Sequence, residues 1–570
     1  MKKTLHALLT LPALALGLAA AGPAASEEYD LLFRGGRVVD GSGAPWFAAD
    51  VAVRGGRIAA VGKLDAARAR RVVDATGLIV APGFIDLLGQ SEYNVLVDGR
   101  AASKITQGIT TEVTGEGYSI APLNDRMLAD NRDQYEKYGY TPDFRTLEGY
   151  FETFEKRGAS INLGTFVGAG GVRDFVIGKE DRRATPQELA RMGAVVEEAM
   201  KEGALGLSSS LQYVPDMYNS TEELIAMAKV AARYGGAYFT HQRSESNRIE
   251  ASMDEVFRIA REAGIRAQIW HFKTAYAPNF GKMPAMLGKL EAARAGGIDV
   301  AANQYPWSRA SNGLDACLPP WVREGGREAL LKRLADPATR ERVKSDMAKE
   351  SADWENQWLG SGGAQGVMVA EVLSEKLKPY EGKTIAEIAA AEKKDPRDVV
   401  IDLVIADRAN AACIISIMDE QDVRAALAHR LVSFGTDSQA KATDGPFARE
   451  TSHPRGWGSA SRILGYYVRD QKVLPLEEAV RKMTSFAAEA AGIPDRGLVK
   501  VGFWADLAAF DPKTVNARAT FEKPNQYSEG IPYVAVNGVL VVDGGKITDA
   551  RPGKPVRGPG YAGAGRERVR

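Results

Sequence analysis

The chain has 570 residues, of which 45% are hydrophobic and 26% are charged, close to the averages for globular proteins. Its 73 Lys and Arg residues balance 73 Asp and Glu residues, so no net field favours nucleic acid or anionic lipid as a partner. The length exceeds what one ordinary core needs, and we expect a large barrel with at least one satellite domain.

The first residues have the pattern of a secretory signal peptide. Lys2 and Lys3 precede an apolar run over residues 7–21, and small residues follow at positions 24–26. An uncleaved anchor is the alternative, but about 15 apolar residues are short for a membrane span. We therefore expect residues 1–26 to be removed, no stable membrane insertion afterwards, and a periplasmic or secreted protein.

Short alternating segments near both ends predict a β-sandwich that the two ends of the chain build together. The N-terminal part, residues 27–80, has strand-like segments separated by Gly-Gly turns at 35–36 and 55–56. Similar segments return at 505–510 and 533–543, within a C-terminal part that covers residues 496–550. The remaining residues, 551–570, are rich in Gly, Pro and Arg and are expected to form a flexible tail, with a lightly docked strap as the alternative.

Between these ends, strand-like runs alternate with amphipathic helical patterns. Residues 186–202 are followed by an apolar run at 204–209, and residues 222–234 by another at 238–241. This alternation predicts an α/β fold, a (β/α)₈ TIM-like barrel over residues 81–495. A charged stretch at 323–352 interrupts the alternation and is expected to be a helical insertion near the mouth of the barrel.

After the signal peptide the chain has four histidines, and two of them end predicted strands. His241 and His271 each close such a run, so both are expected at the carboxyl ends of barrel strands, where TIM barrels carry their active sites. One such histidine is more often a hydrogen-bonded core or surface residue, but two at successive strand ends favour zinc. His429 is expected on the surface, and His453 is expected to be structural. Cys317 and Cys413 are expected to be buried free thiols, with a disulfide as the alternative.

Two acidic residues follow two further predicted strands. Glu116 lies between Gly115 and Gly117 after a β-branched run, where it can be a carboxylate ligand or a solvated loop acid. Asp437 ends the run 431–437, and a carboxylate buried there needs a cation or hydrogen-bond donors. We interpret Asp437 as a general base.

A series of short motifs extends over nearly the whole chain after the signal peptide. In chain order they are 81–86, 107–111, 202–208, 241–243, 271–273, 305–306, 418–420, 435–437, 453–455, 462–466, 482–484, 505–507 and 510–512. Together they resemble the N-acyl-D-amino-acid deacylases, or D-aminoacylases, of the amidohydrolase superfamily. That resemblance implies a zinc ion held by one cysteine and two histidines, with a strand-end aspartate as base. His241 and His271 fall on the histidines, Asp437 on the aspartate, and Glu116 on the cysteine after a one-residue gap.

The resemblance breaks where the family has a metal-binding His-x-His motif. This chain has Leu88-Gly-Gln90 there, and Ala169 replaces a further histidine, which argues against a second metal bound in the usual manner. Gln90 and Glu92 either contribute oxygen contacts or solvate a loop. Glu92 and Glu112 also remain alternatives to Glu116 as the third zinc ligand. Because imidazoles are lost and Leu88 is apolar, we expect this corner to accept a bulkier acyl group or a D-residue-containing peptide.

The resemblance also implies a site for the free carboxylate of a small-molecule substrate. Its residues are Lys273, Tyr305, Ser311 and Arg455, and an Arg fork with a Lys and a hydroxyl suits a planar anion. Salt bridges to neighbouring acids are the alternative for Lys273 and Arg455. The sequence thus predicts an exported amidohydrolase with one zinc per chain that cleaves N-acyl-D-amino acids or related D-residue-containing substrates. A dipeptidase or cyclic-amide hydrolase on the same barrel, and a non-catalytic binding descendant, are the alternatives.

Overall fold

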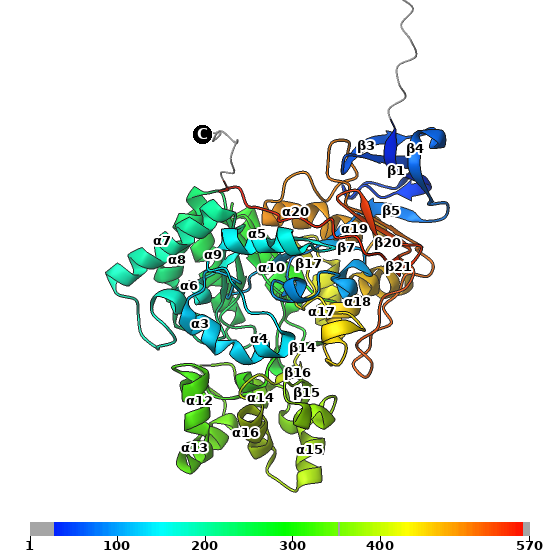
Figure 1. Ribbon diagram of the computed structural model, residues 1–570. Coiled ribbons are helices and arrows are strands. Elements are labelled where there is room, and N and C mark those ends of the chain that lie inside the picture. The colour runs from blue at the N-terminus through cyan, green and yellow to red at the C-terminus, as the bar shows by residue number, and fades with distance from the viewer. Residues whose placement is uncertain (1–27, 352–353, 562–570) are drawn as a thin grey trace, which may run out of the picture.

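The computed structural model describes residues 28–351 and 354–561 (Figure 1). The expected signal peptide, residues 1–26, lies outside this part of the chain. In the part described, no helix is both long enough and apolar enough to cross a membrane. Cys317 and Cys413 are both buried and free, as expected.

Parallel strands form a ring that presents the candidate site at one end. The strands are β6 (Phe84–Asp86), β7 (Ile109–Thr114), β8 (Asn162–Thr165), β9 (Val167–Gly168), β10 (Gly206–Ser210), β11 (Ala237–His241), β12 (Arg266–Ile269), β13 (Val300–Gln304) and β17 (Val432–Phe434). The six-stranded sheet β17-β13-β12-β11-β10-β9 and the three-stranded sheet β6-β7-β8 supply eight positions when β8 and β9 are taken as one interrupted strand. The ring closes where the Leu87 N–H donates to Phe434 O at 3.3 Å, which joins the end of β6 to β17.

Helices return the chain between these parallel strands. They include α7 (Pro186–Glu202), α8 (Thr221–Arg233), α9 (Ile249–Ala263) and α10 (Met283–Ala295). Capping boxes start two of them, Thr185 with Glu188 at α7 and Ser220 with Glu223 at α8. At the other end of α7, Gly203 adopts a φ of 110°, which a residue with a side chain rarely tolerates. Local sequence therefore determines where these helices begin and end.

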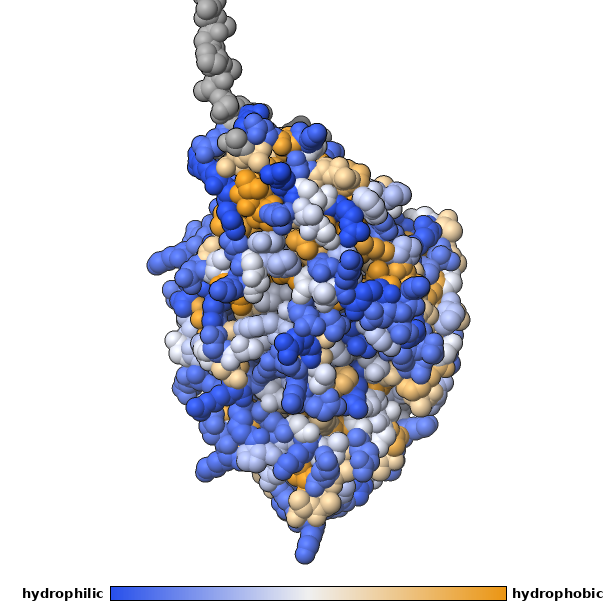
Figure 2. Space-filling view, turned by 90° about the vertical axis from the view of Figure 1, so that its right-hand side faces the viewer, coloured by the Kyte–Doolittle hydropathy of each residue, from blue (hydrophilic) through white to orange (hydrophobic). Residues whose placement is uncertain are grey.

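Strands from both ends of the chain form one mixed nine-stranded sheet outside the ring (Figure 1). From the N-terminal part come β1 (Tyr29–Val38), β2 (Phe47–Arg54), β3 (Arg57–Gly62), β4 (Ala69–Asp74) and β5 (Ile79–Pro82), and from the C-terminal part β18 (Leu507–Phe510), β19 (Tyr533–Val536), β20 (Val539–Asp543) and β21 (Lys546–Ile547). The two parts meet where β18 pairs antiparallel with β5. Since β5 leads into β6, this sheet anchors the first strand of the ring. Figure 2 shows a mostly hydrophilic face, with hydrophobic residues gathered near the N-terminal strands.

The segment between β13 and β17 forms a lobe beneath the ring (Figure 1). An antiparallel sheet in the order β14-β16-β15 crosses it, made of β14 (Arg309–Gly313), β15 (Val367–Glu371) and β16 (Ala412–Ser416). Its helices include α12 (Arg327–Leu334), α13 (Pro337–Met347), α15 (Ile385–Glu392) and α16 (Pro396–Ala406). The lobe is thus larger than the insertion expected at 323–352. The expected insertion was too short because the short strands and helices of the lobe resemble a further βα repeat in the sequence.

Residues 551–561 run along the ring as a docked strap, the alternative to the flexible tail. Val556 N donates to Leu163 O at 2.8 Å and Leu163 N donates to Lys554 O at 3.2 Å, so the segment pairs with β8. Gly553 makes this approach possible, because a Cβ there would lie 2.0 Å from Ile161 O. Residues 562–570 lie outside the part that the structure describes.

Candidate metal centre and substrate site

Glu116, His241 and His271 come together at the carboxyl ends of three strands. Glu116 follows β7, His241 ends β11, and His271 follows β12. Glu116 Oε1 lies 3.1 Å from His241 Nδ1 and 3.1 Å from His271 Nε2. The three candidate ligand atoms all lie within 4.8 Å of one another, and no other such cluster of metal-ligating side chains occurs in the described residues.

The Glu116 carboxylate and the two imidazoles stabilise each other's charged forms. Burial disfavours the Glu116 carboxylate, but hydrogen bonds with His241 and His271 outweigh it and hold the Glu116 pKa well below its usual range. Burial and the Lys273 ammonium disfavour protonated His271, but Glu245 and Glu116 outweigh them and raise its pKa to about 9. Positive charge therefore gathers around the buried Glu116 carboxylate. Two imidazoles and one carboxylate are also the donors of hydrolytic zinc sites, so these residues fit zinc.

Glu245 supports the two histidines from the side away from Glu116. Its Oε1 lies 2.9 Å from His271 Nδ1, and its Oε2 lies 3.9 Å from His241 Nε2. Lys273 Nζ donates to the same Oε1 at 2.5 Å. A carboxylate behind a ligating histidine fixes the orientation of its ring. The sequence analysis did not single out Glu245, although an acid four residues after a candidate ligand was a possible signal.

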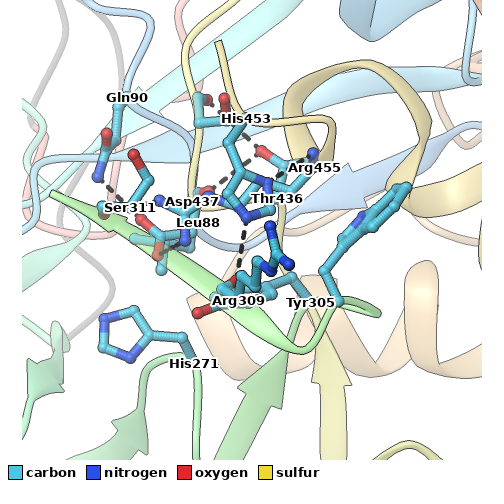
Figure 3. Close-up of polar contacts among 12 residues, drawn as sticks. Leu88, Gln90, His271, Tyr305, Arg309, Ser311, Thr436, Asp437, His453 and Arg455 are labelled. Carbon is cyan, nitrogen blue, oxygen red and sulfur yellow. Dashed lines mark hydrogen bonds and ion pairs between the residues drawn. The ribbon is translucent and has the colours of Figure 1, made fainter. Parts of the chain in front are cut away.

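Asp437 lies beside the trio, just after β17. Its φ is 52°, a strained conformation for a residue with a side chain, and its N–H donates to Leu88 O at 2.7 Å. Arg455 Nη1 lies 2.6 Å from Asp437 Oδ2 (Figure 3). Burial raises the Asp437 pKa; Arg455 opposes this shift and the charge of Glu116 adds to it. A carboxylate with a raised pKa at a cavity wall is suited to accept and return a proton.

Gln90 joins Asp437 to the trio. Its Nε2 donates to Glu116 Oε2 at 3.0 Å. The same nitrogen donates to Asp437 Oδ1 at 3.0 Å (Figure 3). The sequence analysis considered only oxygen contacts or loop solvation for Gln90, whereas its amide nitrogen makes the contacts. Leu88 is fully buried in an apolar cluster with Ile85 and Val113. It lines none of the main cavities, so it does not provide the apolar corner expected for an acyl group.

The two alternative third ligands lie outside the cluster of candidate ligand atoms. Glu112 is fully buried, where it accepts a hydrogen bond from Ser91 Oγ at 2.7 Å and lies 3.3 Å from Lys104 Nζ. Glu92 has a pKa raised to about 7, chiefly by burial. Neither belongs to the cluster of candidate ligand atoms, which contains Glu116 as its acid.

The residues expected to hold a substrate carboxylate surround the same space. Lys273, Tyr305 and Ser311 line a cavity of about 320 Å³ together with the trio and Asp437. Arg455 lines an adjoining cavity, and its guanidinium lies 4.8 Å from the centre of the Tyr305 ring. Lys273 also pairs with Glu245, and Arg455 pairs with Asp437. The geometry is therefore compatible with both interpretations of these two residues, substrate binding and salt bridging.

The two remaining histidines of the described chain lie outside the trio. His453 Nδ1 accepts a hydrogen bond from Arg455 N, and Nε2 donates to Arg309 O, both at 3.0 Å. Burial and the charge of Arg455 hold the His453 pKa well below its usual range, so its ring is neutral. His453 thus positions the backbone of Arg455. His429 follows α17 (Glu420–Ala428) and lies half-buried beside Glu291.

Known proteins are similar to this chain over nearly its whole length. Residues 71–542 match the Amidohydrolase family. The D-aminoacylase of Alcaligenes xylosoxydans xylosoxydans is 35% identical over 523 residues, which cover 90% of this chain and 95% of that protein. The N-acyl-D-glutamate deacylase of the same organism is 34% identical, with 93% and 97% covered. A crystal structure of N-acyl-D-glutamate deacylase from Bordetella bronchiseptica, complexed with zinc and a phosphonate inhibitor, is 31% identical with a TM-score of 0.78, covering 93% of this chain and 100% of that one.

The chain therefore belongs to the amidohydrolase family and, within it, to the D-aminoacylases. It has the α/β fold of that family, and it is a D-aminoacylase-like hydrolase of carbon–nitrogen bonds other than peptide bonds. The resemblance deduced from the motifs is confirmed.

Proposed function

We propose that the protein is an exported, zinc-dependent deacylase with one zinc per chain. It cleaves the amide bond of N-acyl-D-amino acids or related D-residue-containing substrates. The observation that carries this proposal is the Glu116 carboxylate between two imidazoles. These three residues line one cavity together with Asp437 and Lys273. The names and zinc content of the relatives support the substrate class and the metal.

In this proposal Glu116, His241 and His271 hold the zinc, and Glu245 fixes the rings of the histidines. When bound, zinc would lower the pKa of water toward about 7 and would polarise the amide carbonyl. Asp437 takes the proton of the attacking water and then delivers it to the leaving amine nitrogen. The products are a carboxylic acid and a free amino acid.

The substrate carboxylate binds between Lys273 and Arg455, next to Tyr305 and Ser311. Both cations already have a carboxylate partner, so the substrate shares rather than replaces those ion pairs. Because Arg455 also contacts Asp437, it connects the binding site of the substrate carboxylate to the general base. This link favours substrates with a free carboxylate next to the scissile amide over cyclic amides that lack one.

The contacts of Gln90 support the proposal of a single zinc. A binuclear centre has been studied in the solved D-aminoacylase. Here the Gln90 amide donates to both Glu116 and Asp437, so these two carboxylates are joined by a neutral group. Leu88 offers no ligand atom at the neighbouring position. We infer that the chain holds one ion where its relative holds two.

The proposed architecture is a (β/α)₈ barrel over residues 81–495 with a β-sandwich built from residues 27–80 and 496–550. Residues 1–26 direct export to the periplasm or the medium. Amino-terminal sequencing of protein recovered from a periplasmic fraction tests this step. A mature chain that begins near residue 27 is expected, and an intact amino terminus in the cytoplasm contradicts export.

Metal analysis of the purified protein, paired with a panel of N-acyl-D and N-acyl-L amino acids, tests the activity. About one zinc per chain and turnover of the D-substrates alone are expected. The Asp437→Asn variant serves as the control, because it retains the zinc ligands and the carboxylate site but lacks the base. A wild type that binds these compounds without turnover, even with added zinc, contradicts the deacylase and supports a binding protein.

A further inference from the structure

We propose that a second, larger cavity beside the metal centre binds the acyl part of the substrate, and that this part is a peptidyl group. The activity that follows is cleavage of the peptide bond preceding a carboxyl-terminal D-residue, which goes beyond the non-peptide carbon–nitrogen bonds on which this class of hydrolase acts. This inference rests on the proposed deacylase function, since the same zinc site and the same Asp437 act on the bond.

The larger cavity adjoins the metal-site cavity. It has a volume of about 580 Å³, against about 320 Å³ for the cavity around the trio. The two share five lining residues, Gln90, Tyr118, Tyr213, Val214 and Gly313. With the substrate carboxylate at Lys273 and the scissile amide at the trio, a group on the acyl side has this larger space beside it. A small acetyl group leaves it largely unused.

The larger cavity lies between the ring and the lobe. One wall comes from α3 (Asp125–Asp130) and α4 (Arg132–Tyr138), and the opposite wall from α12. In Figure 1, α3 and α4 lie directly above α12. An extended substrate can therefore span from the metal centre to the lobe, which gives the lobe a role in specificity.

The walls of this cavity suit a chain of amides better than an alkyl chain. Five amide side chains line it: Gln90, Asn94, Asn131, Gln134 and Gln439. Charged residues add to them, including Lys179, which pairs with Asp130 at 2.6 Å. An alkyl chain would bury these groups without replacing their hydrogen bonds to water, which is costly. A peptide backbone supplies both donors and acceptors to them.

Arg323 restricts most strongly which chemical groups the larger cavity can bind. The residue is 8% exposed and lines the cavity, and it also borders a smaller one of about 130 Å³. Within the described chain its guanidinium makes no hydrogen bond, its Nε is buried without a partner, and its one ion-pair contact is Asp315 Oδ2 at 3.8 Å. A guanidinium has only donors, so its occupant must offer oxygen acceptors. Peptide carbonyls and a peptidyl carboxylate do so, whereas an alkyl chain does not.

The reaction is a hydrolysis and needs no further reactant. Water adds its oxygen to the peptidyl carbonyl carbon, and the bond from that carbon to the nitrogen of the D-residue breaks. Asp437 carries one proton from the water to that nitrogen. The products are a peptide with a free carboxylate and a free D-amino acid, as for any other linear amide.

Three substrates that share one D-residue test the proposal. The D-residue is the one that the wild type releases fastest from its N-acetyl derivative. The three substrates are its N-acetyl, N-decanoyl and N-acetyl-Ala-Ala derivatives. Release of the D-amino acid is measured for each. We expect kcat/KM to be about tenfold higher or more for the peptidyl substrate than for the N-acetyl one, the effect of one added hydrogen bond to a charged group. A preference for the decanoyl or the acetyl substrate overturns the inference but leaves the deacylase proposal intact. No turnover of any of the three overturns both.

Variants of Arg323 test its contact with the peptidyl group. Arg323→Met should lower the ratio of peptidyl to N-acetyl kcat/KM about tenfold, mainly through KM for the peptide, and Arg323→Lys should restore part of it. Arg261→Met is the matched control, because Arg261 is exposed on α9, and it should leave the ratio unchanged. Melting curves exclude misfolding as the cause. An equal loss on all substrates, or an unchanged ratio in Arg323→Met, overturns the role of Arg323 as an oxygen-binding group.

Discussion

The two sides of the barrel mouth satisfy buried carboxylates in different ways. On the side of β7, β11 and β12, the Glu116 carboxylate lies between two imidazoles, an arrangement that fits a metal ion. On the side of β6 and β17, Asp437 is held by the Gln90 amide and the Arg455 guanidinium. The difference shows that a buried carboxylate at the mouth can be held without a metal ion, because neutral and cationic side chains can pair with it.

The β6–β17 side also has a buried charge network beneath it. Lys104 Nζ donates to Asp86 Oδ2 at 2.8 Å, to Thr436 Oγ1 at 2.7 Å and to Ser438 O at 2.7 Å. Asp86 Oδ1 accepts from Thr436 N at 2.7 Å. Residues on both sides of Asp437 are thus fixed, which explains how its strained backbone persists.

Removal of the carboxylate on the metal side should have the largest effect. Glu116→Ala should lower zinc affinity by more than about 100-fold, because loss of a direct ligand exceeds the effect of losing a group that only orients one. Elemental analysis after dialysis measures this. Glu92→Gln is the control, since Glu92 was an alternative ligand but lies outside the trio. Zinc retained by Glu116→Ala and lost by Glu92→Gln would reverse the assignment.

On the opposite side, Asp437→Asn should lower kcat by roughly 10²- to 10⁴-fold, the usual contribution of a general acid–base group. Zinc content should stay at the wild-type value, because Asp437 is not one of the three ligands. Steady-state kinetics with metal analysis on the same sample separates the two sides of the mouth. Loss of zinc together with activity would show that Asp437 belongs to the metal centre.

Lys104→Met tests the network beneath Asp437. It leaves Asp86 buried without its cation, and breaking such a pair lowers the free energy of unfolding by about 3–5 kcal/mol. Urea denaturation measures the change. In the control, Lys289→Met removes a surface ion pair with Asp254 and should cost at most about 1 kcal/mol. Equal effects of the two variants would argue against a structural role for the network.

Gln90→Ala sharpens the comparison further, because it removes the donor that joins the two carboxylates. We expect kcat to fall about tenfold, from the loss of hydrogen bonds to charged groups, with the first zinc retained. Titration with excess zinc then shows whether a second ion enters. No change in kcat would mean that Arg455 alone holds Asp437.

The smallest effect should come from Glu92, through pH. Its pKa rises from 4.5 unfolded to about 7 folded, chiefly by burial, so the folded state binds its proton more tightly. The stability that this contributes is full below pH 4.5 and is lost as pH rises through 7. In Glu92→Gln the decline in unfolding free energy over that interval should be shallower than in the wild type. Parallel curves for the two proteins would contradict the shifted pKa.

Sequence alone determined which residue types stand at the ends of strands. Strand runs that end in Glu116, His241, His271 and Asp437 are local patterns, and parallel strands present their carboxyl ends at one edge. Those patterns were enough to select four residues that the fold brings together. Helix boundaries were equally local, because caps such as Thr185 with Glu188 act within one turn.

Only the tertiary structure decided what surrounds those residues. Gln90 and Asp437 are separated by 347 positions, and their contact exists because the ring closes between β6 and β17. Glu245 reaches both histidines, and Arg323 faces the acyl-side cavity, for the same reason. Contacts of this kind depend on where distant strands and the lobe meet, and no local pattern of residues encodes that distance.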